Sequence, residues 1–189
     1  MSTATASRSE VLELLRDADP VRAARRLAIR PGMVVTWTRS DPPADWLVDG
    51  SSEGTIEAHR AAHTAGRPSE ACVRYGAGVP TETVAARLVA LGELARETGL
   101  LRAICPTPAE GDTRRPGSWG YEDHVVVAAA RLAAPDVQWI RPDWRRLGPA
   151  ACQVAGAFGA TAWRLPAADR SDPELLAAAV GAEARERGA

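Results

Sequence analysis

The chain has 189 residues, of which 46% are hydrophobic and 25% are charged, and its formal net charge is −1. This length suits one domain with a buried core and leaves little room for two. The near-neutral charge excludes the basic surface that binds DNA, RNA or anionic membranes, and no run of about eighteen apolar residues could span a membrane. The first residues, MSTATASRSE, lack the apolar core of a signal peptide. We therefore expect a cytoplasmic protein that binds neither nucleic acid nor membrane.

Lysine is absent from the sequence, which excludes Schiff-base chemistry and a P-loop lysine. The three cysteines are Cys72, Cys105 and Cys152, and none has the CxxC spacing of a zinc site or a redox motif. His59 and His63 are one helical turn apart, a spacing that can bind a metal, but no motif supplies a further ligand. We expect buried thiols, no metal and no cofactor.

Apolar periodicity and capping residues predict helices that alternate with strands along most of the chain. Asp19-Pro20 begins a helix, because aspartate caps the first turn and proline tolerates its first position. Residues 69–75, SEACVRY, alternate between two faces as a strand does. The expected elements are, in chain order, helices over 9–15 and 20–28, a strand over 33–38, a helix over 52–65, a strand over 69–75, a helix over 81–99, a strand over 100–105, a helix over 121–134, a strand over 137–141, a helix over 147–158, a strand over 161–165, and a final Ala-rich helix from 173 that frays into the last residues.

This order predicts an α/β fold, because strands joined by helical crossovers form a parallel sheet. We expect four to five strands with helices packed outside, either as an open parallel sheet or as a partial (βα) barrel. The whole chain, residues 1–189, is interpreted as a single α/β domain with a helical segment over 1–31 and βα repeats over 32–189. Residues 41–52 and the Pro/Gly-rich residues 106–120 are predicted to be irregular, and loops of that length are often functional.

Five segments of the chain resemble, in the same order, one group of enzymes. From residue 75 the chain reads YGAGVPTETVAARLVALGELARETG, which resembles the "YGH … ETGG" segment of radical SAM enzymes of the futalosine route to menaquinone and of deazaflavin (F420) synthesis. The other similar segments are ADPVRAARR with VVTW, IEAHRAAHTAG, EDHVVVAAARL, and IRPDW with FGATAW. Within the group the chain is most similar to the aminofutalosine synthases. The resemblance implies that its strands derive from a barrel.

The departures from this group bear directly on chemistry. In these enzymes the first strand is followed by CxxxCxxC, whose thiolates hold an iron–sulfur cluster that cleaves S-adenosylmethionine. Here residues 38–43 read TRSDPP, and Ala77 stands where the family has the histidine of its YGH motif. Only about thirty residues separate the first strand from the segment like the family's sixth, so we expect the intervening strands to be missing. The resemblance therefore implies a relative without the cluster, and no catalytic residue carries over.

A candidate ligand site follows from strand polarity. If the strands run as in a barrel, their carboxyl ends and the loops that follow them meet at one edge. The residues expected to bind a ligand there are Arg39, Arg74, Tyr75, Arg102, Arg141, Asp143 and Trp144. Such a site would hold a small anionic or aromatic ligand, with arginine binding a carboxylate or phosphate. The alternative is that these charges form internal salt bridges, since Glu70 shares a strand face with Arg74 and Arg141 shares one with Asp143.

Three interpretations remain open from the sequence. In the first, the chain is a non-catalytic accessory or partner protein linked to menaquinone biosynthesis, and it forms a homodimer or a complex with a full-length radical SAM enzyme that covers its exposed sheet edges. In the second, it is a small-molecule enzyme or binding protein that uses the Arg-rich edge. In the third, it is an independent α/β domain. We favour the first.

Overall fold

The computed structural model describes residues 6–27, 34–39, 54–111 and 120–186. Its elements are α1 (Arg8–Asp17), α2 (Pro20–Leu27), β1 (Val34–Arg39), α3 (Ile56–Thr64), β2 (Ser69–Tyr75), α4 (Thr81–Thr98), β3 (Leu101–Pro108), α5 (Tyr121–Ala133), β4 (Trp139–Ile140), α6 (Trp144–Ala155), η2 (Gly156–Phe158), β5 (Ala162–Leu165), α7 (Pro173–Ala178) and β6 (Glu183–Glu186). The α/β class is confirmed. Segment 41–52 and most of loop 106–120 lie outside the described residues.

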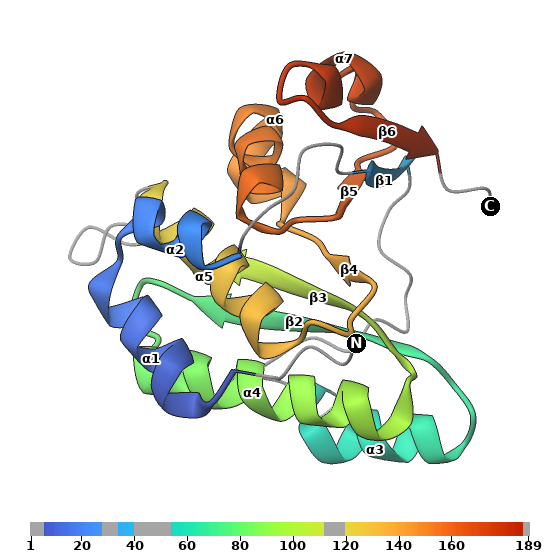
Figure 1. The fold of residues 1–189 in the computed structure, drawn as a ribbon. Coiled ribbons are helices and arrows are strands. Elements are labelled where there is room, and N and C mark those ends of the chain that lie inside the picture. The colour runs from blue at the N-terminus through green and yellow to red at the C-terminus, as the bar shows by residue number, and fades with distance from the viewer. Residues whose placement is uncertain (1–5, 28–33, 40–53, 112–119, 187–189) are drawn as a thin grey trace.

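The strands form two sheets, where the sequence predicted one sheet of four to five strands. One sheet has the order β2-β3-β4 and the other the order β5-β1-β6, and every pairing is parallel. Among the described residues the strands do not close into a barrel. Figure 1 shows the short β4 between β3 and the strand β5 of the second sheet.

The separation of the two sheets has a local cause at Thr161. The backbone N–H of Thr161 donates to the carbonyl oxygen of Ile140 at 2.9 Å, so β4 and the start of β5 do touch. A second backbone hydrogen bond between the two segments is not formed, because the N–H of Ile140 donates to the hydroxyl of Thr161 at 3.1 Å instead of to a backbone oxygen. A single backbone hydrogen bond is less than a parallel ladder requires. The strand predicted over 137–141 is accordingly only two residues long.

The C-terminal segment is also different from the prediction. The helix expected to continue from residue 173 ends at Ala178. Gly181 then takes a φ of +70°, a left-handed conformation that glycine adopts without a Cβ clash. The chain reverses there, and β6 pairs in parallel with β1. Helix-forming composition in the last residues was outweighed by this pairing.

Strand β3 is longer than predicted because its prolines occupy permitted positions. The N–H of Arg141 donates to the oxygen of Ile104, so Ile104 faces β4. Strand periodicity turns Pro106 and Pro108 to the same side, beyond the end of β4, where the described residues include no partner strand to accept an N–H. The missing proline donors therefore leave the ladder to β2 intact.

One face of the β2-β3-β4 sheet carries the larger core. Helices α4 and α5 pack on it, and α1 and α2 pack on those helices in turn (Figure 1). Gly92 of α4 lies so close to the end of α5 that a Cβ there would overlap the carbonyl oxygen of Ala133. A smaller core, with Val35, Trp144 and Trp163, lies between α6 and the second sheet. In the described part of the chain no helix has the length and apolar character needed to cross a membrane.

Candidate functional site

The face of the strands opposite α4 and α5 is polar and concave. Glu70 of β2 accepts hydrogen bonds from two guanidinium groups: Arg141 Nη1 lies 2.8 Å from its Oε2, and Arg164 Nη2 lies 2.9 Å from the same oxygen. Strands β3 and β4 separate β2 from β5, and each step across a flat sheet is about 4.8 Å. Arg164 of β5 can reach Glu70 only because the strands curve towards each other. We call this surface the concave face.

The ion pairs on the concave face are shielded from water. The side chains of Arg141, Glu70 and Arg164 are 4%, 16% and 11% exposed. Burial alone would raise the pKa of the Glu70 carboxyl, but the positive charges and hydrogen bonds of Arg141 and Arg164 hold that pKa below its ordinary value. Arg141 also lies over the ring of Trp139 at 5.7 Å, a cation–π distance. Two guanidinium groups thus share the single carboxylate of Glu70 on this face.

Two thiols lie beside these ion pairs. Cys72 of β2 and Cys105 of β3 are register partners on the concave face. Burial, together with the neighbouring Cys72, raises the pKa of the Cys105 thiol. Both cysteines belong to a small buried cluster with Trp139. A raised pKa makes the Cys105 thiol a poor nucleophile.

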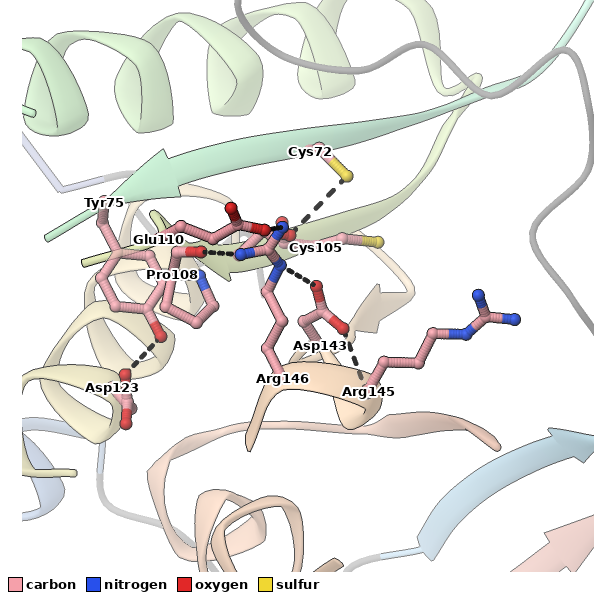
Figure 2. A network of polar contacts seen from close by, with 10 residues as sticks. Cys72, Tyr75, Cys105, Pro108, Glu110, Asp123, Asp143, Arg145 and Arg146 are labelled. Atoms are coloured by element: carbon pink, nitrogen blue, oxygen red, sulfur yellow. Dashed lines mark hydrogen bonds and ion pairs between the residues drawn. The ribbon is translucent and has the colours of Figure 1, made fainter. Parts of the chain in front are cut away.

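A second polar group lies where β2 and β3 end. The hydroxyl of Tyr75 donates to Asp123 Oδ1 at 2.6 Å, and Figure 2 shows the ring directed at that carboxylate. Burial and the negative charge of Asp123 raise the pKa of Tyr75. In the same view Arg146 lies between the carbonyl of Pro108, at 3.2 Å, and the carboxylate of Asp143, at 3.6 Å. These contacts tie the strand ends to α5 and α6.

Arg39 and Trp144 meet at the loop after β5. The guanidinium of Arg39 donates to the carbonyl oxygens of Asp169 and Ser171. The indole Nε1 of Trp144 donates to the Asp169 carboxylate at 2.8 Å. Burial would raise the pKa of that carboxyl, but hydrogen bonds from Ser171 and Trp144 and the charge of Arg39 lower it. Both side chains hold this loop in place.

The seven predicted site residues therefore fall into separate environments. Arg141 lies on the concave face, Tyr75 at the end of β2, and Arg39 and Trp144 at the loop after β5. Asp143 caps α6 by accepting from the N–H of Arg145 at 3.1 Å. Arg74 is exposed on β2. Arg102 is exposed at the amino end of β3, opposite to the edge on which the sequence prediction placed it, because it follows directly on the strand's first residue. Their ligand-binding role stays a prediction.

Sequence reasoning did not select Glu70, Arg164 or Asp123 as site residues. Alternation in SEACVRY put Glu70 on the same face as Cys72, and alternation in AWRL separates Arg164 from Trp163 in the same way. The missing information was the curvature that brings β5 close to β2. Nothing in the sequence marked Asp123 as a site residue. It lies in the first turn of α5, where acidic residues are common because they interact favourably with the helix dipole.

The two histidines of α3 belong to a buried hydrogen-bonded chain. Ser69 Oγ lies 2.7 Å from His59 Nδ1 and 2.8 Å from His63 Nε2. The hydroxyl of Thr98 donates to Leu94 and lies 2.8 Å from His63 Nδ1, so it accepts from that nitrogen. His63 then accepts from Ser69, which in turn accepts from His59 Nδ1. Within the described residues no group of three or more metal-ligating side chains is present.

Comparison with known proteins gives weak and partial matches. The chain is 31% identical over 122 residues to the aminodeoxyfutalosine synthase of Thermus thermophilus, covering 59% of this chain and 32% of that enzyme. It is 28% identical over 111 residues to the 5-amino-6-(D-ribitylamino)uracil–L-tyrosine 4-hydroxyphenyl transferase of Archaeoglobus fulgidus, covering 56% of this chain and 32% of that enzyme. The chain spans about a third of the length of these curated relatives. No protein-family model matches it. These matches support a distant relationship to the radical SAM enzymes that the sequence resembles.

Proposed function

We propose that the chain is a non-catalytic accessory protein, related to radical SAM enzymes, that docks on a full-length enzyme of the aminodeoxyfutalosine synthase type. The observation that carries the proposal is the pairing of Arg141 and Arg164 with Glu70. In this cluster the guanidinium groups of Arg141 and Arg164 already bind the carboxylate of Glu70. A charged substrate or cofactor on the concave face would have to compete with that carboxylate. The sequence also has no CxxxCxxC segment with which to hold a cluster.

The docking surface is assigned to the edge of β2 that faces away from β3. Among the described residues β2 pairs only with β3, and β6 pairs only with β1, so these two strands form the sheet edges. The edge strand β6 carries Glu183, Arg185 and Glu186, and charged side chains on an edge discourage pairing with another strand. Strand β2 is seven residues long, and its exposed side chain is that of Arg74. It is the edge better suited to accept a partner strand.

Edge pairing can be tested without disturbing the core. The oxygen of Tyr75 accepts from Ala109, so Tyr75 faces β3 and its neighbour Arg74 faces away from β3. The variant Arg74→Pro removes an N–H from the edge that faces away from β3 while leaving every bond to β3 in place. Arg74→Ala is the matched control, because it removes the same side chain and keeps the N–H.

The measurement is anaerobic native mass spectrometry of the chain mixed with the full-length aminodeoxyfutalosine synthase encoded in the same genome. We expect a stoichiometric complex for the wild type and for Arg74→Ala, and at least a tenfold weaker complex for Arg74→Pro, each variant being checked for native circular dichroism. A chain that stays monomeric at micromolar concentration and retains a stoichiometric small molecule contradicts the proposal. A complex unaffected by Arg74→Pro refutes the assignment of the edge alone.

A further inference from the structure

The thiols of Cys72 and Cys105 are a paired group that the proposed docking function does not use. The two residues are opposite each other on neighbouring parallel strands, and both point to the concave face. They are 8% and 2% exposed. Register partners in adjacent strands lie about 4.8 Å apart along the sheet, so the two sulfur atoms share one small volume. The two cysteines are 33 positions apart in the sequence, so the sequence alone did not predict that they are neighbours.

Burial raises the pKa of the Cys105 thiol, but two groups beside the pair would stabilise a thiolate. The positive charge of Arg141 acts against the rise in the pKa of the Cys105 thiol. The hydroxyl of Thr107 lies 3.8 Å from Cys72 Sγ and 3.2 Å from the carbonyl oxygen of Cys105, and it can donate to either. When the sulfur atom gains charge, donation to sulfur becomes the stronger hydrogen bond. A cation and a hydroxyl donor are thus already in place beside the pair.

We propose that Cys72 and Cys105 form a two-thiolate binding site for a soft monovalent metal ion such as Cu(I). Two thiols bind one Cu(I) as a bis-thiolate complex of net charge −1 and release two protons, with no electron transferred. Thiolate ligands select Cu(I) among the metals available to proteins. A structural zinc site requires four ligands, and the described residues bring no third metal-ligating side chain to this pair.

Charge balance supports a monovalent ion at this place. The bis-thiolate complex would carry one negative charge close to Arg141, whose side chain already shares Glu70 with Arg164. Four charged groups would then balance: the two guanidinium groups against the Glu70 carboxylate and the complex. Coordination also removes the obstacle of burial, since a metal ion deprotonates a coordinating thiol outright. Without the ion, the buried pair remains neutral.

Cys152 provides an internal control. It is fully buried on α6 in the smaller core, and burial raises the pKa of its thiol. No second cysteine lies in that core among the described residues. The variants Cys72→Ser, Cys105→Ser and Cys152→Ser each remove one sulfur atom with little change in volume.

The experiment titrates the purified chain anaerobically with Cu(I) in competition with bicinchoninate, a colorimetric Cu(I) chelator. We expect the wild type and Cys152→Ser to withdraw one ion per chain, and Cys72→Ser and Cys105→Ser each to lose at least a hundredfold in affinity. X-ray absorption at the copper edge of the loaded wild type is expected to show two sulfur neighbours. This spectrum needs no variant and stays informative if a serine variant fails to fold.

Three results would overturn the proposal. One is a wild-type chain that takes no copper from the chelator. Another is a copper spectrum with nitrogen or oxygen neighbours, which would place the ion on histidine or at the surface. The third is equal loss of affinity in Cys152→Ser and Cys72→Ser, which would indicate a general effect of thiol removal. None of these results bears on docking through the β2 edge, so the two proposals fail separately.

Discussion

Replacement of Glu70 by glutamine is expected to destabilise the fold strongly. Glu70→Gln keeps the size of the side chain but leaves Arg141 and Arg164 without their shared counter-charge. Removal of one partner from a buried ion pair costs about 3–5 kcal/mol, because the remaining charge is desolvated and unpaired. Glu70 is still 16% exposed, and Arg164 has further contacts, so we take the lower end, about 3 kcal/mol.

Urea denaturation followed by circular dichroism measures this loss. With a slope near 2 kcal/mol per M, about 3 kcal/mol lowers the urea midpoint by about 1.5 M. The matched control is Glu97→Gln, which removes the exposed pair of Arg60 and Glu97, whose side chains are 53% and 48% exposed. An exposed pair is worth at most about 1 kcal/mol, so the control midpoint should move by less than about 0.5 M.

A double variant separates lost charge from lost packing. Glu70→Gln combined with Arg141→Met removes the most buried charge together with its counter-charge, and a buried ion pair replaced by apolar groups is often neutral in stability. We expect the double variant to recover at least half of the midpoint lost by Glu70→Gln. Equal midpoints for Glu70→Gln and Glu97→Gln, or a double variant weaker than the single one, would refute the reasoning that the concave face is held by this cluster.

Two further predictions concern the histidine chain and the helix contact. Burial, with the positive charge of Arg87, lowers the pKa of His59 to about 4, so the unfolded chain binds more protons than the folded one between about pH 6.5 and pH 4. The free energy of unfolding should fall by about 3 kcal/mol as pH drops through that window. The variant His59→Asn should show a smaller slope, and a ring titration by NMR with an ordinary midpoint would contradict the explanation. Gly92→Ala should lower the thermal midpoint despite its better helix propensity, because the added Cβ meets the carbonyl oxygen of Ala133. Gly156→Ala, with open space at its Cβ, should leave the midpoint within experimental error, and equal shifts for the two would show that close helix packing is not the cause.

Local signals predicted most of the secondary structure. The strand over 69–75 and the helix over 81–98 follow from alternation and from helical periodicity that ends at Gly99, and the structure has both at those positions. The start of α2, where the Asp19 carboxylate accepts from the N–H of Val21 and Pro20 occupies the first turn, is likewise a local property of Asp19-Pro20. These patterns depend on residues a few positions apart, so the chain itself specifies them.

Long-range pairing decided the rest. A hydroxyl at Thr161 intercepts one backbone donor and divides the strands into two sheets, and a C-terminal segment of helical composition pairs with β1 as β6. Amino-acid composition could not indicate the division into two sheets or the pairing of β6 with β1, because each depends on which strands become neighbours in the folded chain.

The same distinction applies to the site. The sequence by itself shows that lysine chemistry and a CxxxCxxC cluster are absent, and it provides acidic, basic and thiol side chains on alternating strand positions. Only the curvature of the strands brings Arg164 to Glu70, and only the register of β2 with β3 brings Cys72 to Cys105. The reason is geometric. Successive side chains of a strand point to opposite faces of the sheet, so the sequence alone tells which residues share a face. Which residues of another strand lie beside them depends on hydrogen bonds between strands that are far apart in the chain.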